Sequence, residues 1–208
     1  MESADRNLPR ELVGVKISLV FPNTESDQHI VQLFNDPLAM EHLVALRKSD
    51  QGGWTLDQVT ARREFQIQEQ SQLRGWFFII LEKSSGMFAG ICGFRSIDWS
   101  NRSAEMGIIL SPSFWGKGFS SEAHYLILSY AFEILHLHRI FFVTASSNLG
   151  MCRFCETVLS CTKDGSLRDF MARSWTDPSK GYDSCELYSI LSLEWTASKS
   201  NLISRLDR

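Results

Sequence analysis

The chain has 208 residues, of which 44% are hydrophobic and 22% are charged, a composition typical of a soluble globular protein with one well-buried core. Its formal net charge of −3 gives no overall electrostatic reason to bind nucleic acid or an anionic membrane, so we expect neither as a partner. The N-terminus lacks the basic and apolar regions of a secretory signal, and no apolar run approaches the ~20 residues of a membrane span. These features predict a cytoplasmic protein. Any site for an anion must be formed by a few neighbouring residues, because the overall charge does not favour one.

The first half of the chain predicts two helices and four strands. In chain order these are a strand over 13–21, helices over 27–34 and 55–70, and strands over 76–82, 87–94 and 103–110. Thr55 and Gln58 have the spacing of a capping box at the start of the second helix. Between the helices, the break Asn35-Asp36-Pro37 precedes a short helical segment to about Leu46, and Gln51-Gly52-Gly53 is predicted as a loop.

The second half predicts further alternating elements. They are a buried amphipathic helix to about 135, a strand over 139–144, a short helix over 148–158, a loop carrying Lys163-Asp164-Gly165, and a last strand over 185–193. Together the elements indicate an α/β fold with a mixed sheet and helices on both faces. We expect one domain over 13–195, an N-terminal extension over 1–12 and a C-terminal tail over 196–208.

The five cysteines are an odd number without the spacing of a disulfide framework, which favours a reducing compartment. Cys152 and Cys155 form a Cys-x-x-Cys pair, a spacing also found in zinc and redox sites. No second paired ligand motif follows, and both cysteines fall in a predicted helix beside Phe154 and Val158. We therefore interpret them as small buried side chains and expect no metal.

Residues 113–123 read Ser-Phe-Trp-Gly-Lys-Gly-Phe-Ser-Ser-Glu-Ala and place Gly116 and Gly118 just before a predicted helix. Glycine lets backbone N–H groups approach a ligand closely, and a helix start offers unpaired N–H donors, so the turn suits a phosphate or pyrophosphate. It is not a Walker A loop, because Lys117 is followed by Gly118, and Ser121 leaves the dinucleotide fingerprint incomplete. A plain glycine-containing helix entry without a ligand is the alternative.

Ordered motifs on several predicted elements agree with one another. They are Glu105-Met-Gly, Trp115-Gly-Lys-Gly-Phe-Ser-Ser-Glu-Ala, Tyr130-Ala-Phe, Leu137-His-Arg-Ile, Asn148, Gly165-Ser-Leu-Arg-Asp and Tyr188-Ser-Ile-Leu-Ser-Leu-Glu-Trp. Over about 16–195 the chain thus resembles the GNAT acetyltransferases of the RimJ/RimL type. The resemblance implies a mixed, mostly antiparallel sheet splayed between its fourth and fifth strands, with acetyl-CoA in the opening. It also allows a homodimer.

The resemblance assigns residues to acetyl-CoA. The family's pyrophosphate motif falls on 115–120, where Trp115 departs from one end and Ser120 from the other. The implied contacts are backbone N–H groups of Gly116, Lys117, Gly118, Phe119 and Ser120. The backbone of Ile109 and Leu110 would pair with the pantetheine arm as a pseudo-strand, and Asn148 would hold the arm from the other side. The Lys117 ammonium either faces a phosphate or is solvated, and Asn148 also suits a helix N-cap.

Acetyl transfer requires the acceptor amine to lose a proton, because an alkylammonium of pKa about 10 is almost wholly protonated at neutral pH. Glu105 matches the family's glutamate in the Ala-Glu-x-Gly-x pattern and is the predicted general base. The alternatives are that Glu105 positions the substrate or pairs with Arg95 or Arg102. Many GNAT enzymes have a tyrosine that acts as general acid, and Cys155 occupies the matching position here. Other members have a serine instead, and Met151 occupies that position. Protonation of the leaving thiolate therefore falls to the Cys155 thiol or to water, with Tyr188 a weaker candidate because it is expected to pack in the last strand.

These features predict an N-acetyltransferase that moves acetyl from acetyl-CoA to a primary amine, either a small molecule or a peptide or protein N-terminus. A non-catalytic acyl-CoA-binding module or sensor is the alternative, since the acid position departs from the family pattern. In the family, acceptor residues come from the first two helices and the last two strands, and here acidic and aromatic side chains favour a cationic or neutral amine. These side chains are Glu41, His42, Trp54, Trp99, Asp177, Tyr182 and Asp183.

Overall fold

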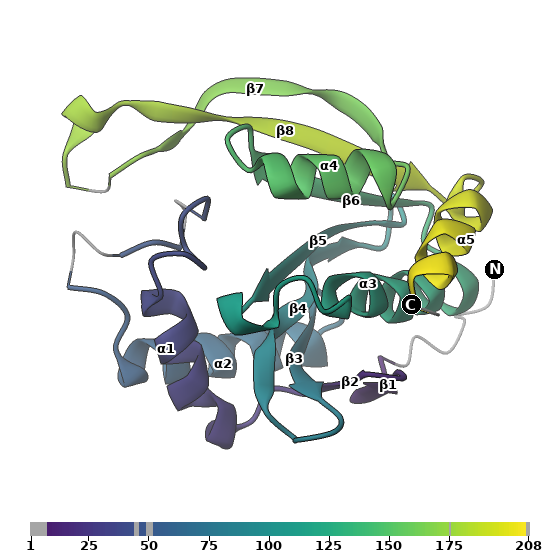
Figure 1. Ribbon diagram of the computed structural model, residues 1–208, viewed down its shortest axis with the longest axis horizontal. Helices are drawn as coiled ribbons and strands as arrows, with labels where there is room; N and C mark the ends of the chain where they lie inside the picture. The colour runs from purple at the N-terminus through teal and green to yellow at the C-terminus, as the bar shows by residue number, and fades with distance from the viewer. Residues whose placement is uncertain (1–7, 44–45, 49–51, 175, 207–208) are drawn as a thin grey trace.

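The computed structural model describes residues 8–43, 46–48, 52–174 and 176–206. An eight-stranded sheet with the order β1-β2-β3-β4-β5-β6-β8-β7 forms its centre (Figure 1). The strands are β1 (Glu11–Val13), β2 (Ile17–Val20), β3 (Trp76–Glu82), β4 (Phe88–Asp98), β5 (Ser103–Leu110), β6 (Arg139–Ala145), β7 (Thr162–Ala172) and β8 (Tyr182–Leu191). The α-helices are α1 (Asp27–Asn35), α2 (Leu56–Ser71), α3 (Phe119–Ser129), α4 (Leu149–Thr157) and α5 (Trp195–Leu206).

One pair of neighbouring strands in this sheet is parallel, β5 with β6, and the other pairs are antiparallel. The parallel ladder is short: it begins at Ser103 with Arg139 and ends at Glu105 with Phe141. On its other side β5 stays paired with β4 as far as Leu110. The two strands therefore separate after Glu105, and since they are the fourth and fifth strands predicted from the sequence, the predicted splayed sheet is confirmed.

Helices cover both faces of the sheet, as predicted. On one face, Ile30 and Phe34 of α1 and Val59 of α2 pack with Ile79 of β3. On the other face, a larger core joins the sheet to α3, α4 and α5. It contains Ile17, Leu19, Phe78, Ile80, Ala123, Ile127, Cys155 and Leu202. The alternation of side chains along each strand separates these two cores. The predicted capping box of α2 is also confirmed, with Thr55 and Gln58 bonding each other's backbone N–H groups.

Three elements differ from the sequence prediction. The predicted loop around Lys163 is wrong, because residues 162–172 form the edge strand β7. Its side chains are mostly polar and exposed, so it lacks the apolar alternation by which strands are recognised. Helix α5 occupies most of the residues assigned to a C-terminal tail, and it buries Trp195, Ser198 and Leu202. Strand β1 similarly begins within the predicted N-terminal extension. Gln51, in the predicted loop, lies outside the described residues.

A buried carboxylate fixes the start of α3 against the sheet. Glu122, in the first turn of α3, is buried and accepts hydrogen bonds from the backbone N–H groups of Val15 and Lys16 between β1 and β2. A Cβ atom on Gly14 would overlap this carboxylate, so a larger residue there would displace the Glu122 side chain. The contact sets the position of the helix N-terminus relative to β2.

We expect Glu122→Ala to lower the free energy of unfolding by about 1–3 kcal/mol, because it leaves backbone donors of Val15 and Lys16 without their acceptor. Urea denaturation measures the change. Glu25→Ala, which removes an exposed carboxylate, is the control and should change the value by less than about 0.5 kcal/mol. Equal losses in the two variants would contradict a role for the buried contact.

Candidate active site

The opening between β5 and β6 exposes strand backbone that has no partner on one side. Residues 106–110 lie beyond the last β5–β6 pair, but each still has a partner on β4. Their backbone polar groups directed toward β6 can therefore bind an extended ligand as an added strand. Ile109 and Leu110, the predicted pseudo-strand residues, lie in this stretch.

The glycine turn follows directly at the end of β5. A short 3-10 turn, Pro112–Phe114, leads into Gly116 and Gly118, whose φ angles of 75° and 84° are left-handed and favour glycine. Gly118 is the N-cap of α3, so the first backbone N–H groups of that helix have no partner within it. The indole N–H of Trp115 donates to the carbonyl of Leu110 at 3.0 Å and ties the turn to the strand. The structure thus places the glycine turn and the unpaired N–H groups of α3 at the end of the open edge.

Glu105 marks the point at which β5 and β6 separate. Its neighbours in sequence, Ala104 and Met106, are buried in the core with α3, so the alternation of β5 directs Glu105 and Gly107 to the face of α1 and α2. A register shift in β4 opposite Glu105 brings Arg95 beside it, and Nη1 of Arg95 donates to Oε1 of Glu105 at 3.1 Å. The Glu105 side chain is 19% exposed. One predicted alternative, the pairing with Arg95, is therefore present.

Asn148 begins α4 on the other side of the opening. Its Oδ1 atom accepts a hydrogen bond from the N–H of Met151 at 3.1 Å, so the predicted N-cap is confirmed. Because the cap uses the amide oxygen, the amide NH₂ group is left to donate to a ligand. Ser147 precedes Asn148 in the same loop between β6 and α4.

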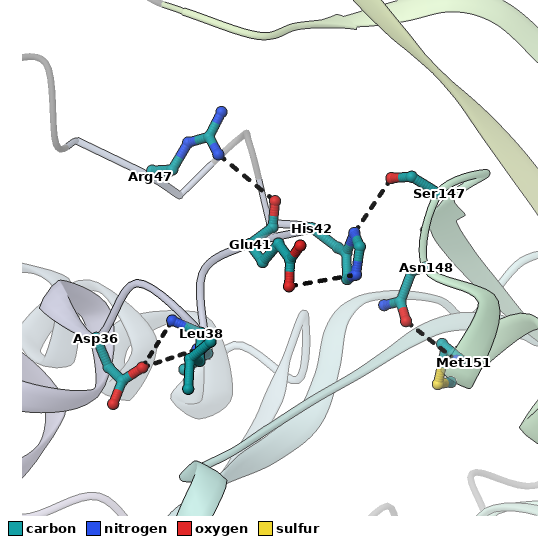
Figure 2. A network of polar contacts seen from close by, with 9 residues as sticks. Asp36, Leu38, Glu41, His42, Arg47, Ser147, Asn148 and Met151 are labelled. Carbon is teal, nitrogen blue, oxygen red and sulfur yellow. Dashed lines mark hydrogen bonds and ion pairs between the residues drawn. The ribbon is translucent and has the colours of Figure 1, made fainter.

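Residues 36–43 and 46–48, which we call the bridging segment, cross from α1 to the far half of the sheet. Nδ1 of His42 lies 3.1 Å from the hydroxyl of Ser147, next to Asn148 (Figure 2). Nη2 of Arg47 donates to the carbonyl of Arg173, beyond β7, at 2.8 Å. The segment therefore connects the two halves of the splayed sheet. Sequence reasoning had placed His42 among the acceptor residues but did not identify Ser147, since no motif distinguishes that serine.

The other residues named for the acceptor have different positions. Trp99 lies between β4 and β5, at the end of β5 away from the glycine turn, where its indole N–H donates to the carbonyl of Leu73, and its assignment to the acceptor site stays a prediction. Asp183 pairs with Arg173 at 2.9 Å, and Asp177 accepts hydrogen bonds from Ser179. Glu41 remains beside His42 with a side chain that is 63% exposed. Trp54 lies under the ammonium of Lys48, 4.2 Å from the ring centre.

Cys155 does not line the open surface of the protein. It is fully buried in the core, and its hydrogen bond with Cys161, together with burial, raises the pKa of the Cys161 thiol. Burial also raises the pKa of Cys152. The interpretation of Cys152 and Cys155 as buried small side chains is confirmed. Among the described residues, no group of three or more His, Cys, Asp or Glu side chains is placed to hold a metal ion. The helices within that part of the chain are too short or too polar to cross a membrane.

A buried histidine lies behind the glycine turn. His124 of α3 packs against the rings of Phe142 and Phe154 and is inaccessible to solvent. Its Nδ1 atom lies 2.7 Å from the carbonyl of Ser120, and because a carbonyl only accepts, Nδ1 carries the proton. Burial lowers the pKa of His124 to about 4, so the imidazole is neutral at pH 7.

The neutral His124 predicts a pH dependence of stability. Its pKa of about 4 in the folded state is below the usual ~6.5 of an unfolded histidine, so its contribution is complete above pH ~6.5 and is lost as the pH falls toward 4. The expected loss is about 3 kcal/mol over this range. Urea denaturation between pH 4 and 7 should show a weaker pH dependence for His124→Phe than for the wild type. The exposed His138→Gln should retain the wild-type dependence, and identical profiles for all three proteins would contradict the assignment.

Residues 18–158, more than half of the chain, match the acetyltransferase (GNAT) domain family, so the chain belongs to the GNAT acetyltransferases. It is 39% identical over 93 residues to the uncharacterized N-acetyltransferase p20 of Bacillus licheniformis, covering 45% of this chain and 52% of that protein. It is 32% identical over 82 residues to spermidine N(1)-acetyltransferase of Escherichia coli strain K12. This match covers 39% of this chain and 41% of that protein. The chain thus matches about half the length, or less, of these relatives.

The fold resembles that of solved acetyltransferases. RimL, a ribosomal L7/L12 alpha-N-protein acetyltransferase solved with coenzyme A, superposes with a TM-score of 0.74 over 88% of this chain and 97% of its own. Its sequence identity of 15% limits the likeness to the fold. The family membership predicted from the sequence motifs is confirmed.

Proposed function

We propose that this protein is an N-acetyltransferase that transfers the acetyl group of acetyl-CoA to a primary amine. The observation that carries the proposal is the continuous path formed by the open edge of β5 and the left-handed glycine turn at its end. An extended amide chain fits the first part and a pyrophosphate fits the second. Few other ligands combine these two features.

The chain's own residues fit acetyl-CoA on both sides of the opening. The backbone of Ile109 and Leu110 would pair with the pantetheine arm, while the amide NH₂ of Asn148 would donate from the α4 side. The N–H groups of the turn from Gly116 to Ser120 would hold the pyrophosphate. When bound, acetyl-CoA supplies the acetyl group as a thioester that a free amine can attack.

Glu105 is the proposed general base. Its carboxylate, which accepts a hydrogen bond from Arg95, is the group that would accept a proton, either directly from the acceptor ammonium or through one water. The neighbouring Gly107 leaves open space, because nothing lies within 4 Å of a Cβ placed there. An amine can therefore approach on the same face of β5 as the carboxylate.

Glu105→Gln should lower kcat by roughly two to four powers of ten near neutral pH, the range typical of a lost general base. The difference should shrink at high pH, where the free amine becomes abundant. Thiol release measures the rate, and calorimetry checks that CoA still binds. Glu64→Gln, on the exposed surface of α2, is the control with unchanged activity. A near wild-type rate for Glu105→Gln at pH 7 would assign Glu105 to positioning or ion pairing instead.

Protonation of the leaving thiolate is assigned to water rather than to Cys155. The Cys155 thiol is fully buried against Cys161, and moving it into the opening would disrupt the core beneath α4. The thiol that forms has a pKa near 8.5, so the leaving thiolate can take a proton from solvent water without a dedicated acid. The sequence position of Cys155 matches the family's acid, but its surroundings are those of a packing residue.

The proposed acceptor is a cationic or neutral primary amine, with a small molecule favoured over a peptide N-terminus. Glu41 on the bridging segment and Glu105 on β5 are carboxylates on the side of α1 and α2 from which an amine would approach. They attract a cation and disfavour an anionic acceptor. A relative that matches part of this chain is a spermidine acetyltransferase, which agrees with this preference.

A panel of amines and short peptides incubated with acetyl-CoA tests the function. We expect acetylation of polyamines or other cationic amines, read by both thiol release and product mass. Glu41→Gln should raise KM for a cationic acceptor more than for a neutral one, because it removes charge without changing shape. Acetylation confined to anionic amines would refute the charge argument. CoA binding without acetylation of any panel member would identify a non-catalytic binding module.

A further inference from the structure

A cationic cavity lies beside the glycine turn, on the β2–β3 side of the sheet. It has a volume of about 390 Å³ and joins three separate parts of the chain. Its lining residues are Val15, Lys16, Glu82, Lys83, Ser84, Lys117 and Phe119. Three of these side chains are lysines, although the protein as a whole has a formal net charge of −3.

Two carboxylates lie near the three lysines, Glu82 in the lining and Glu122, which accepts a hydrogen bond from the backbone N–H of Lys16, but two of the ammonium groups have other partners. Nζ of Lys83 donates to the carbonyl of Gly14 at 2.8 Å, and Nζ of Lys117 lies 4.5 Å from the ring centre of Phe114. Within the part of the chain that the structure describes, none of the three lysines forms an ion pair with a carboxylate. Glu82, the acidic residue of the lining, accepts a hydrogen bond from Ser85 at 2.6 Å.

Two of the lysines are neighbours across the sheet. The backbone N–H of Lys83 donates to the carbonyl of Lys16 at 2.9 Å, and both side chains line the same cavity. Like charges on neighbouring strands repel one another, so two ammonium groups that line one cavity favour an anion between them. A phosphate in the cavity would remove that repulsion and would accept hydrogen bonds from the ammonium groups.

The cavity is continuous with the turn at the start of α3. Nζ of Lys16 lies 3.6 Å from the position of a Cβ on Gly118, and Lys117 stands between the two glycines. Under the proposed function, this turn holds the pyrophosphate of acetyl-CoA. CoA carries one more phosphate, a monoester on the 3′-oxygen of the ribose, which is attached to the same pyrophosphate. When CoA is bound, this phosphate therefore lies close to the turn.

We propose that Lys16, Lys83 and Lys117 form a binding site for the 3′-phosphate of CoA. The proposal rests on the proposed function, because it requires CoA to bind at the turn. It makes this protein selective for CoA over 3′-dephospho-CoA, which keeps the pyrophosphate and the pantetheine arm but lacks the monoester. The selectivity depends on charge and decreases as salt screens the lysines.

Calorimetric titration with CoA and with 3′-dephospho-CoA at low salt tests the site. We expect the wild type to bind CoA about three- to tenfold more tightly, which corresponds to one charge-assisted contact at a partly exposed site. Lys16→Ala and Lys83→Ala should each weaken CoA binding while leaving the affinity for 3′-dephospho-CoA nearly unchanged. Lys199→Ala is the matched control, because Lys199 pairs with Glu133 on other elements of the fold and should keep the full preference.

Inorganic phosphate provides a second arm of the same experiment. At millimolar concentration it should weaken binding of CoA, which needs the monoester site, more than that of 3′-dephospho-CoA. Equal affinity of the wild type for the two compounds would overturn the 3′-phosphate site and leave the proposed function intact. Equal weakening of both compounds by Lys16→Ala and Lys83→Ala would also overturn it, since the lysines would then contact the pyrophosphate. A wild type that binds neither compound would overturn the proposed function as well.

Discussion

The site depends on the early end of the pairing between β5 and β6. Three pairs of residues join these strands, and the ladder stops at Glu105 with Phe141. Backbone N–H and C=O groups beyond that point need another partner, because unpaired polar groups are costly once water is excluded. Strand β5 nevertheless keeps its shape to Leu110, since β4 pairs with it along its other edge. The opening is therefore a stable part of the sheet, with a ready hydrogen-bonding edge.

The elements around the opening are held by contacts of unequal strength. At its closed end, α3 and α5 pack on each other in the large core, and Trp195 of α5 donates to Glu133 at 2.7 Å. At its open end, the bridging segment reaches the far half through the contact of His42 with Ser147 (Figure 2). Arg47 adds a hydrogen bond to the carbonyl of Arg173. A single hydrogen bond of this kind contributes about 1 kcal/mol, far less than the buried core. The core thus sets the geometry of the halves, and the bridging segment adds two weaker contacts between them.

Charge is distributed between the two sides of the fold in a way that suits the proposed substrates. Lys16, Lys83 and Lys117 gather at the turn before α3, where an anionic donor would bind. Glu41 and Glu105 face the side of α1 and α2, where a cationic acceptor would approach. The net charge of −3 conceals this separation, because it sums groups that lie on different faces of the sheet. Local charge therefore says more about ligands here than the overall charge does.

Sequence alone determined the type of fold, the glycine turn and the helix cap at Asn148, because these depend on local patterns of glycine, apolar and capping residues. It did not reveal β7 or α5, since an exposed edge strand and a helix with few buried residues have weak patterns. Tertiary structure alone decided that Cys155 is buried in the core and that the Trp99 indole bonds the carbonyl of Leu73. It also brought His42 to Ser147 and Lys16 to Lys83, pairs separated in the chain by 105 and 67 residues. Such contacts depend on how the sheet aligns distant segments, and no local pattern of residues encodes that alignment.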